Sequence, residues 1–90
     1  MPKPILSIGM IVKNEIRCIE RCLKSLQPLQ DEIPCQLVIA DTGSTDGTHD
    51  IAEQYADVLI DFPWVGDFSA ARNAVMERCE GEWYLTMDAD

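Results

Sequence analysis

The chain contains four short apolar blocks, and a polar break follows each of the first three. The blocks, residues 5–12, 35–40, 58–60 and 83–87, are rich in β-branched and aromatic residues and have the length of buried strands. Residues 5–12 are continuously apolar apart from Ser7 and Gly9, which is typical of a central parallel strand that is covered on both faces. The pattern therefore predicts a four-stranded parallel sheet.

The segments between these blocks carry apolar residues at helical spacing, so three helices are expected. Asn14 is a suitable N-cap for the first helix, and Pro28 is expected to end it at about residue 27. Thr45 or Asp46 is suited to cap the second helix, and Asp67 the third, which begins at about residue 68. Strands and helices thus alternate along the whole chain.

This alternation with short links predicts a three-layer α/β/α fold, with right-handed crossovers and the strand order 3-2-1-4. Open sheets of this kind bind ligands beyond the carboxyl ends of their strands, near the point where the strand order reverses. Asn14, Asp41, Asp88 and Asp90 all follow strands and should gather at that edge. The sequence therefore predicts a ligand site there, which we interpret as a site for a nucleotide and a metal.

The loop of residues 41–48 is the centre of this predicted site. Asp41 could cap its own turn or accept hydrogen bonds from a ligand, and its position alone favours neither. Gly43 and Gly47 permit an anion to approach the start of the next helix, although neither glycine-rich phosphate-binding motif is present. A partial calcium-loop pattern starts at Thr42, but an EF-hand needs a helix before the loop, and here a strand precedes it. Asp41 stands beyond the apolar part of its strand, so it is expected to matter for binding and not for folding.

Three charged side chains have two interpretations each. Asp88 and Asp90 alternate on a strand, so both carboxylates could point into one cleft. Two such charges about 5 Å apart repel by about 3 kcal/mol, and a divalent cation would turn this repulsion into binding. The spacing alone slightly favours a solvent-exposed turn without an ion, because D-x-D is common. Arg72 lies on the polar side of its helix, where it could pair with a neighbouring acid or face an anionic ligand.

Composition limits the partners and the cellular location that can be expected. Seven basic and sixteen acidic residues give a net charge of −9, which argues against a nucleic-acid partner. No apolar run approaches the roughly 20 residues of a membrane span, and no signal peptide is evident, so a cytoplasmic location is expected. The four cysteines lack metal-ligand spacing and are expected to be reduced thiols that pack as small apolar side chains.

Taken together, the motifs resemble the start of a family-2 glycosyltransferase of the GT-A fold. Residues 7–15 resemble the first strand of that family and its Asn-Glu ending, and residues 41–48 match its second-strand signature. Residues 71–73, Ala-Arg-Asn, match a helix motif, and residues 88–90 match the metal-binding D-x-D. The Met-Ile-Val-Lys-Asn-Glu variant, with the sequence of residues 67–73, resembles a bacterial subgroup that acts on lipopolysaccharide cores or on peptides.

This resemblance implies that a sugar is transferred with inversion from a nucleotide-diphosphate sugar donor, with Mg²⁺ or Mn²⁺. Asp41 would contact the base, Asp88 the ribose or the metal, and Asp90 the metal on the diphosphate. Arg72 would lie near the nucleotide. The end of the first strand would add three further substrate-binding residues: Val12, Asn14 and Glu15.

The resemblance also limits what these 90 residues are expected to do alone. They would form the nucleotide-sugar-binding N-terminal half of a transferase domain, cut after the D-x-D motif, and the catalytic base would lie beyond Asp90. The acceptor would be a glycan, a lipid-linked glycan or a peptide, and the longer protein could be membrane-peripheral. The isolated chain is expected to be inactive and to self-associate through bare sheet edges. The alternative is a non-catalytic α/β module that binds a nucleotide or an ion.

Overall fold

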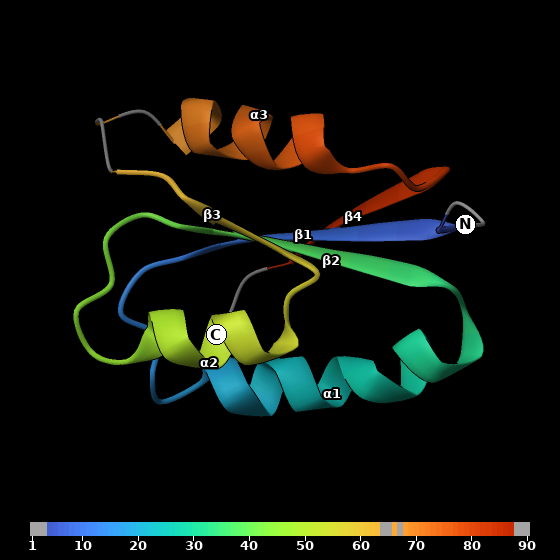
Figure 1. The fold of residues 1–90 in the computed structure, drawn as a ribbon, viewed down its shortest axis with the longest axis horizontal. Helices are drawn as coiled ribbons and strands as arrows, with labels where there is room; N and C mark the ends of the chain where they lie inside the picture. Colours follow the sequence, from blue (N-terminus) through green and yellow to red (C-terminus); the bar gives the residue numbers. More distant parts are fainter. Residues whose placement is uncertain (1–3, 64–65, 67, 88–90) are drawn as a thin grey trace.

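The computed structural model describes residues 4–63, 66 and 68–87, and Figure 1 shows their arrangement in three layers. Helices α1 and α2 cover one face of the sheet, and α3 covers the other. The elements follow in the order β1 (Leu6–Val12), α1 (Ile19–Glu32), β2 (Cys35–Asp41), α2 (Thr48–Tyr55), β3 (Val58–Asp61), α3 (Phe68–Arg78) and β4 (Trp83–Met87).

The four strands are parallel and lie in the order β3-β2-β1-β4, as the sequence predicts. Their register aligns the strand ends: Val12 is opposite Asp41, and Asp41 is opposite Asp61. On the other side of β1, Met10 is opposite Met87. The carboxyl ends of β1, β2 and β3 therefore form one edge, and β4 reaches the same edge.

Apolar side chains fill the space on both sides of the sheet. Between the sheet and the pair α1 and α2, the core is built from alternate strand residues and from one stripe of each helix. The smaller core beneath α3 is centred on Val38, Ala40 and Val75. Fully buried residues of the larger core include Ile8, Met10, Ile19, Leu37, Ile39 and Ala52.

The first helix differs from the expectation at both ends. It begins at Ile19, with Cys18 in the N-cap position, and not after Asn14. Asn14 has a left-handed φ of 52°, and its side-chain oxygen accepts from the Thr45 amide instead of from an amide of the first helical turn. The helix also continues through Pro28 to Glu32. Leu26 is buried, and Leu29 packs against the core, so tertiary contacts hold the chain helical on both sides of an exposed proline.

One further expectation is corrected. Helix α2 has Gly47, with φ 97°, at its N-cap position, and neither Thr45 nor Asp46 occupies that position. Strand β4 is more exposed than the central strands: Trp83 is 69% exposed and Leu85 is 41% exposed. The reason is that β4 is an edge strand, and the contacts of the three helices centre on the other strands and on each other. Asp67, the expected cap of α3, lies outside the described residues.

All four cysteines are free, as expected, and each is half-buried. Burial raises the pKa of the Cys35 and Cys79 thiols, so both stay protonated at neutral pH. Cys22, Cys35 and Cys79 pack against the core as small apolar side chains. Within the part of the chain that the structure describes, no helix has the length and apolarity that crossing a bilayer requires.

Candidate nucleotide site

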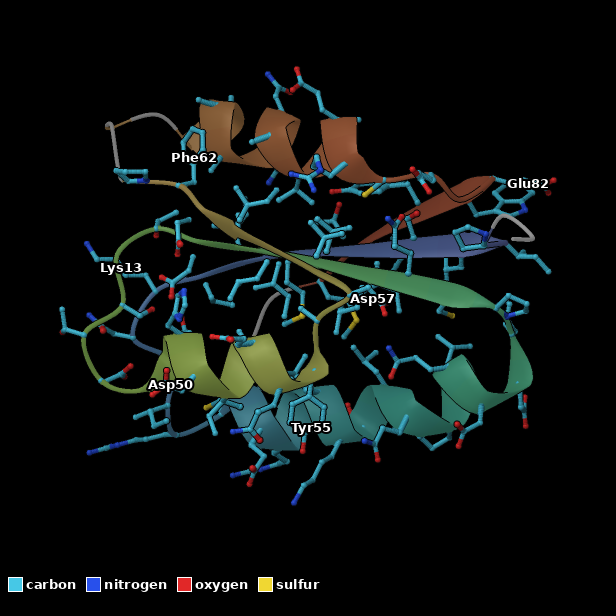
Figure 2. The ribbon with its side chains drawn as sticks, in the orientation of Figure 1. Lys13, Asp50, Tyr55, Asp57, Phe62 and Glu82 are labelled. Carbon is cyan, nitrogen blue, oxygen red and sulfur yellow. The ribbon has the colours of Figure 1, made fainter. Side chains whose placement is uncertain are left out.

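A hollow of about 200 Å³ opens at the carboxyl edge of the sheet, between the ends of β2 and β3 and the first turn of α2. Figure 2 shows Phe62, which lines it, at the same edge as Lys13 and Asp50, whereas Glu82 lies at the opposite edge. The hollow is lined by Asp41, Gly43, Ser44, His49, Asp61, Phe62 and Pro63. It lies at the carboxyl edge, where open parallel sheets bind ligands, but beside β2 and β3 and not at the reversal of strand order between β1 and β4.

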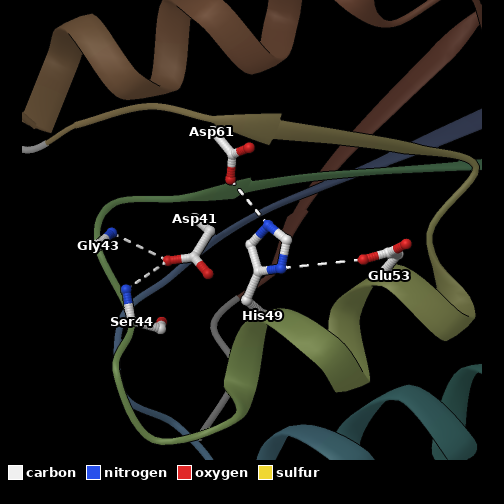
Figure 3. Close-up of polar contacts among 6 residues, drawn as sticks. All are labelled: Asp41, Gly43, Ser44, His49, Glu53 and Asp61. Carbon is white, nitrogen blue, oxygen red and sulfur yellow. Dashed lines mark hydrogen bonds and ion pairs between the residues drawn. The ribbon is translucent and has the colours of Figure 1, made fainter.

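Asp41 is the polar group at the base of this hollow. It follows the apolar residues of its strand, as expected, but it is still the last residue of β2 and only 4% exposed. Its Oδ1 accepts hydrogen bonds from the amides of Gly43, at 3.0 Å, and Ser44, at 2.8 Å (Figure 3). The turn-capping interpretation of Asp41 is therefore confirmed for this oxygen.

The second oxygen of Asp41 is different. Oδ2 is buried and has no hydrogen-bond partner among the described residues. A buried carboxylate oxygen without a partner is costly and rare, because burial removes the water that would otherwise solvate it. An incoming N–H or O–H group would supply the missing hydrogen bond. Asp41 thus holds its own loop with one oxygen, and its other oxygen has no partner among the described residues.

His49 and Asp61 form the opposite wall of the hollow. His49 Nε2 lies 2.8 Å from Asp61 Oδ1, and Nδ1 lies 3.9 Å from Glu53 Oε2 (Figure 3). Asp61 is opposite Asp41 in the sheet, so the two carboxylates end neighbouring strands on the same face. The sequence analysis missed both residues of this wall. Asp61 could have been found, because it directly follows the third apolar block.

One group of side chains near the hollow has metal-ligand character. His49, Asp50 and Glu53 place ligand atoms within 4.8 Å of one another. Asp50 and Glu53 are exposed, and the Nε2 atom of the imidazole is already paired with Asp61. Exposed acidic groups of this kind are common without an ion, so the group alone does not indicate a metal centre.

Asn14 joins the loop after β1 to the loop after β2. Its backbone amide donates to Ser44 Oγ at 2.9 Å, and its side-chain Oδ1 accepts from the Thr45 backbone amide at 2.8 Å. The carbonyl oxygen of Val12 also accepts from the Thr42 amide, at 3.0 Å. Asn14 therefore connects two segments about 30 residues apart in the sequence, rather than capping the helix that follows it.

Two further hydrogen bonds extend this connection. The Glu15 amide donates to Thr48 Oγ1 at 2.8 Å, and the Ile16 amide donates to Asp46 Oδ2 at 3.2 Å. Together with the two bonds of Asn14 we call these the inter-loop hydrogen bonds. They count against the calcium-loop interpretation, because the side-chain oxygens of Ser44 and Asp46 accept hydrogen bonds from backbone amides; in addition, strand β2 and not a helix precedes the loop.

Hydrogen bonding shifts the pKa of Asp46. The hydroxyl of Thr48 donates to its carboxylate, with smaller support from the amides of Thr48 and Ile16, and the pKa falls below the ordinary value of 3.8. A lowered pKa in the folded state means that ionised Asp46 stabilises the fold above the ordinary value, and that this stability is lost as the pH falls through the folded pKa.

We therefore expect Asp46→Asn to lower the free energy of unfolding at about pH 7, with the difference from the unsubstituted protein closing as the pH falls through the lowered pKa of Asp46 in the folded state. Urea unfolding of both proteins across this range measures the difference. A gap that is the same size at both ends of the range would show that the carboxylate charge of Asp46 does not contribute.

The remaining sequence-predicted residues lie at different distances from the hollow. The Val12 side chain is buried in the core between the sheet and α1, and only its carbonyl contributes to the edge. Glu15 contributes its amide to the inter-loop hydrogen bonds. Arg72 is exposed on α3 and is not among the residues that line the hollow. Asp88 and Asp90 lie outside the described residues, so their assignment to a metal stays a prediction.

Comparison with known proteins identifies relatives along nearly the whole chain. It is 39% identical over 97% of its length to the glycosyltransferase SunS of the Bacillus subtilis SPbeta prophage, and 41% identical over 94% to a TPR repeat-containing protein of Synechococcus elongatus. It is 32% identical to the lipopolysaccharide core biosynthesis glycosyltransferase LpsC of Rhizobium meliloti. The chain spans 20% of the first two proteins and 33% of LpsC.

Solved structures share the fold at lower identity. A mannosyltransferase of Pyrobaculum calidifontis, in complex with GDP-Man and Mn²⁺, matches the whole chain with a TM-score of 0.81 and 23% identity, over 28% of its own length. Glucosyl-3-phosphoglycerate synthase of Mycobacterium tuberculosis, in complex with Mn²⁺ and UDP, matches 97% of the chain with a TM-score of 0.78, over 34% of its own length. These likenesses place the chain in the Rossmann-like GT-A fold.

The family model for glycosyl transferase family 2 matches residues 7–90, which include the predicted first strand, the loop of residues 41–48 and the D-x-D motif. A match over nearly the whole chain decides the family. The chain belongs to glycosyl transferase family 2.

Proposed function

We propose that residues 1–90 are the donor-binding half of a glycosyltransferase domain, and that the protein as a whole transfers a sugar from a nucleotide-diphosphate donor with inversion. Membership of glycosyl transferase family 2 supports the reaction class. The observation that carries the binding site is the buried Oδ2 of Asp41, which lacks a partner among the described residues and belongs to a residue that lines the hollow at the strand ends.

The chemistry of this oxygen selects the part of the donor that binds there. An ionised carboxylate only accepts hydrogen bonds, and Asp61 on the other wall presents the same kind of group. A nucleobase with a ring N–H satisfies Asp41, whereas a phosphate would meet two negative charges. We therefore place the base in the hollow and the diphosphate away from it. Solved GT-A structures with bound GDP-Man and UDP support a nucleotide ligand at this fold.

The metal end of the site is proposed at Asp88 and Asp90. Carboxylate oxygens are the hard ligands that Mg²⁺ and Mn²⁺ prefer, and both neighbouring structures named above contain Mn²⁺. Strand β4 pairs with β1 up to Met87, so the chain reaches the carboxyl edge just before the D-x-D motif. When bound, the ion would act as a Lewis acid that neutralises the leaving diphosphate.

The chain's own residues then divide the work of binding. Asp41 holds the base, and the inter-loop hydrogen bonds keep its loop in place. Arg72 is proposed near the nucleotide, on the α3 side. No residue of the chain is proposed as the catalytic base, which we expect beyond Asp90. The acceptor is proposed as a glycan, a lipid-linked glycan or a peptide, and the location as cytoplasmic, with membrane-peripheral association of the whole protein.

A titration with Mn²⁺, followed by water-proton relaxation, tests the metal part of this proposal. We expect weak Mn²⁺ binding alone and much tighter binding with a nucleoside diphosphate, because two carboxylates are too few for a tight site without substrate phosphates. Asp90→Ala should remove the nucleotide-dependent signal. A signal that Asp90→Ala leaves intact contradicts the metal assignment.

A turnover assay distinguishes a transferase from a non-catalytic binding module. The transferase interpretation predicts turnover of a labelled donor by the whole protein and none by residues 1–90 alone. Nucleotide and Mn²⁺ binding without turnover in the whole protein would favour the module. Sedimentation of residues 1–90 tests the expected self-association, which a clean monomer would contradict.

A further inference from the structure

We propose that Asn14 is a positioning residue, which acts on nucleotide binding through Asp41 rather than by touching the ligand. The proposal rests on the proposed function, because it concerns the base-binding oxygen of Asp41. It is carried by a continuous series of hydrogen bonds that runs from Asn14 through the 43–45 segment to that carboxylate.

The first step of the series is the backbone of Asn14. Its φ of 52° is the left-handed conformation, which Asn and Asp adopt several-fold more often than other residues with a side chain. In this conformation the backbone amide of Asn14 donates to Ser44 Oγ at 2.9 Å, and its side-chain oxygen accepts from the Thr45 amide at 2.8 Å. Asn14 thereby forms hydrogen bonds with two consecutive residues of the loop after β2.

The second step is the effect on Asp41. The 43–45 segment, to which Asn14 is hydrogen-bonded, supplies the two amides, of Gly43 and Ser44, that donate to Asp41 Oδ1. A carboxylate held through one oxygen by two donors cannot rotate freely, so its other oxygen is fixed in direction. That other oxygen is Oδ2, the buried atom that lacks a partner among the described residues (Figure 3). Asn14 therefore pre-organises the acceptor that the base would use.

The residue type at position 14 is decided by two requirements at once. Glycine satisfies the left-handed backbone but has no side-chain acceptor, whereas most residues with a side chain are strained at positive φ. Only Asn and Asp combine a low strain with a short side-chain oxygen. The Oδ1 atom of Asn14 already holds the Thr45 amide, so a direct contact with the ligand is not needed to explain why Asn stands there.

Two substitutions distinguish the contribution of the Asn14 backbone conformation from that of its side chain. Asn14→Gly keeps the left-handed conformation and removes the acceptor, and Asn14→Asp keeps both. Calorimetric titration should use uridine diphosphate or guanosine diphosphate, whichever the unsubstituted protein binds more tightly, with Mn²⁺ present. We expect Asn14→Gly to weaken binding about tenfold and Asn14→Asp to stay within about twofold of the unsubstituted protein.

A double-mutant cycle with Asp41→Asn tests the route of the effect. If Asn14 acts through Asp41, Asn14→Gly should have little further effect once Asp41 is replaced, because the oxygen that it positions is gone. An undiminished loss in the Asp41→Asn background overturns the proposal, since it would mean a route that avoids Asp41. Amide exchange supplies a second readout: the Gly43 and Ser44 amides should exchange faster in Asn14→Gly.

The remaining outcomes distinguish this inference from the function on which it rests. If Asp41→Asn weakens nucleotide binding and Asn14→Gly does not, the positioning role is wrong and the base site stands. If Asp41→Asn binds like the unsubstituted protein, or if neither nucleotide binds at all, the base site is wrong and the inference falls with it. Should Asn14→Gly fail to fold, Ser44→Ala removes the partner of the Asn14 amide, and unchanged affinity in that variant overturns the proposal.

Discussion

Replacing Gly81 by alanine should lower the free energy of unfolding by about 3 kcal/mol. A Cβ atom at this position would lie 2.7 Å from the amide nitrogen of Ser7 and 2.8 Å from the carbonyl carbon of Leu6. These are backbone atoms of β1, which pairs on both sides in the sheet and cannot move aside. The Gly81 amide also donates to Ser7 Oγ at 2.8 Å, so any shift of the turn breaks a partly buried hydrogen bond.

Urea unfolding measures this effect, and Gly9→Ala is the matched control. A Cβ atom at Gly9 would also be crowded, but by the Tyr84 and Val75 side chains; Tyr84 is 36% exposed as a residue, so its side chain can turn outward. We therefore expect Gly9→Ala to cost less than Gly81→Ala, and Val75→Ala to relieve part of the crowding. Equal stability of Gly81→Ala and the unsubstituted protein would mean that the turn before β4 does not pack on β1 as described.

Replacing Asp41 by asparagine should weaken the binding of a nucleoside diphosphate about ten- to a hundredfold, the range for losing one hydrogen bond to a charged group. The substitution preserves shape. The amide oxygen of asparagine can still accept from Gly43 and Ser44, while its NH₂ group takes the place of Oδ2 and turns an acceptor into a donor. Folding should therefore be little changed, and the loss should appear in binding.

Asp61→Asn is the control for the charge of the hollow. Asp61 lines the same hollow and ends the neighbouring strand, but its side chain is 79% exposed and its charge is screened by water. We expect a change of no more than a few-fold in nucleotide affinity. An effect of Asp61→Asn as large as that of Asp41→Asn would mean that the net charge of the hollow matters, and not the buried oxygen of Asp41.

The strands and their order could be predicted because the information is local. Each apolar block in the sequence is long enough to name a strand, and the alternation with helices leaves few topologies. The start of α1 could not be predicted in this way. Asn14 has the residue type of an N-cap, but its partners are Ser44 and Thr45, about 30 residues away, and only the folded chain brings them together. The prediction that Pro28 ends the helix failed for a related reason, because core packing overrides this local helix-breaking signal.

The candidate site was predictable in position but not in detail. The rule for strand ends places Asp41 at the correct edge, yet its burial and the different roles of its two oxygens depend on the loop geometry. Asp61 was overlooked although it ends the strand next to that of Asp41. His49 could not be found by the rule for strand ends, because it reaches the hollow from a helix. Arg72 was assigned by resemblance, and the hollow does not include it.

The central claim is that a nucleobase donates its ring N–H to Oδ2 of Asp41. Calorimetry with the preferred nucleoside diphosphate and with the same nucleotide methylated at that ring nitrogen tests it directly. We predict that methylation weakens binding to the unsubstituted protein at least about tenfold, and that this difference nearly disappears in Asp41→Asn. Equal binding of both nucleotides to the unsubstituted protein would contradict the claim.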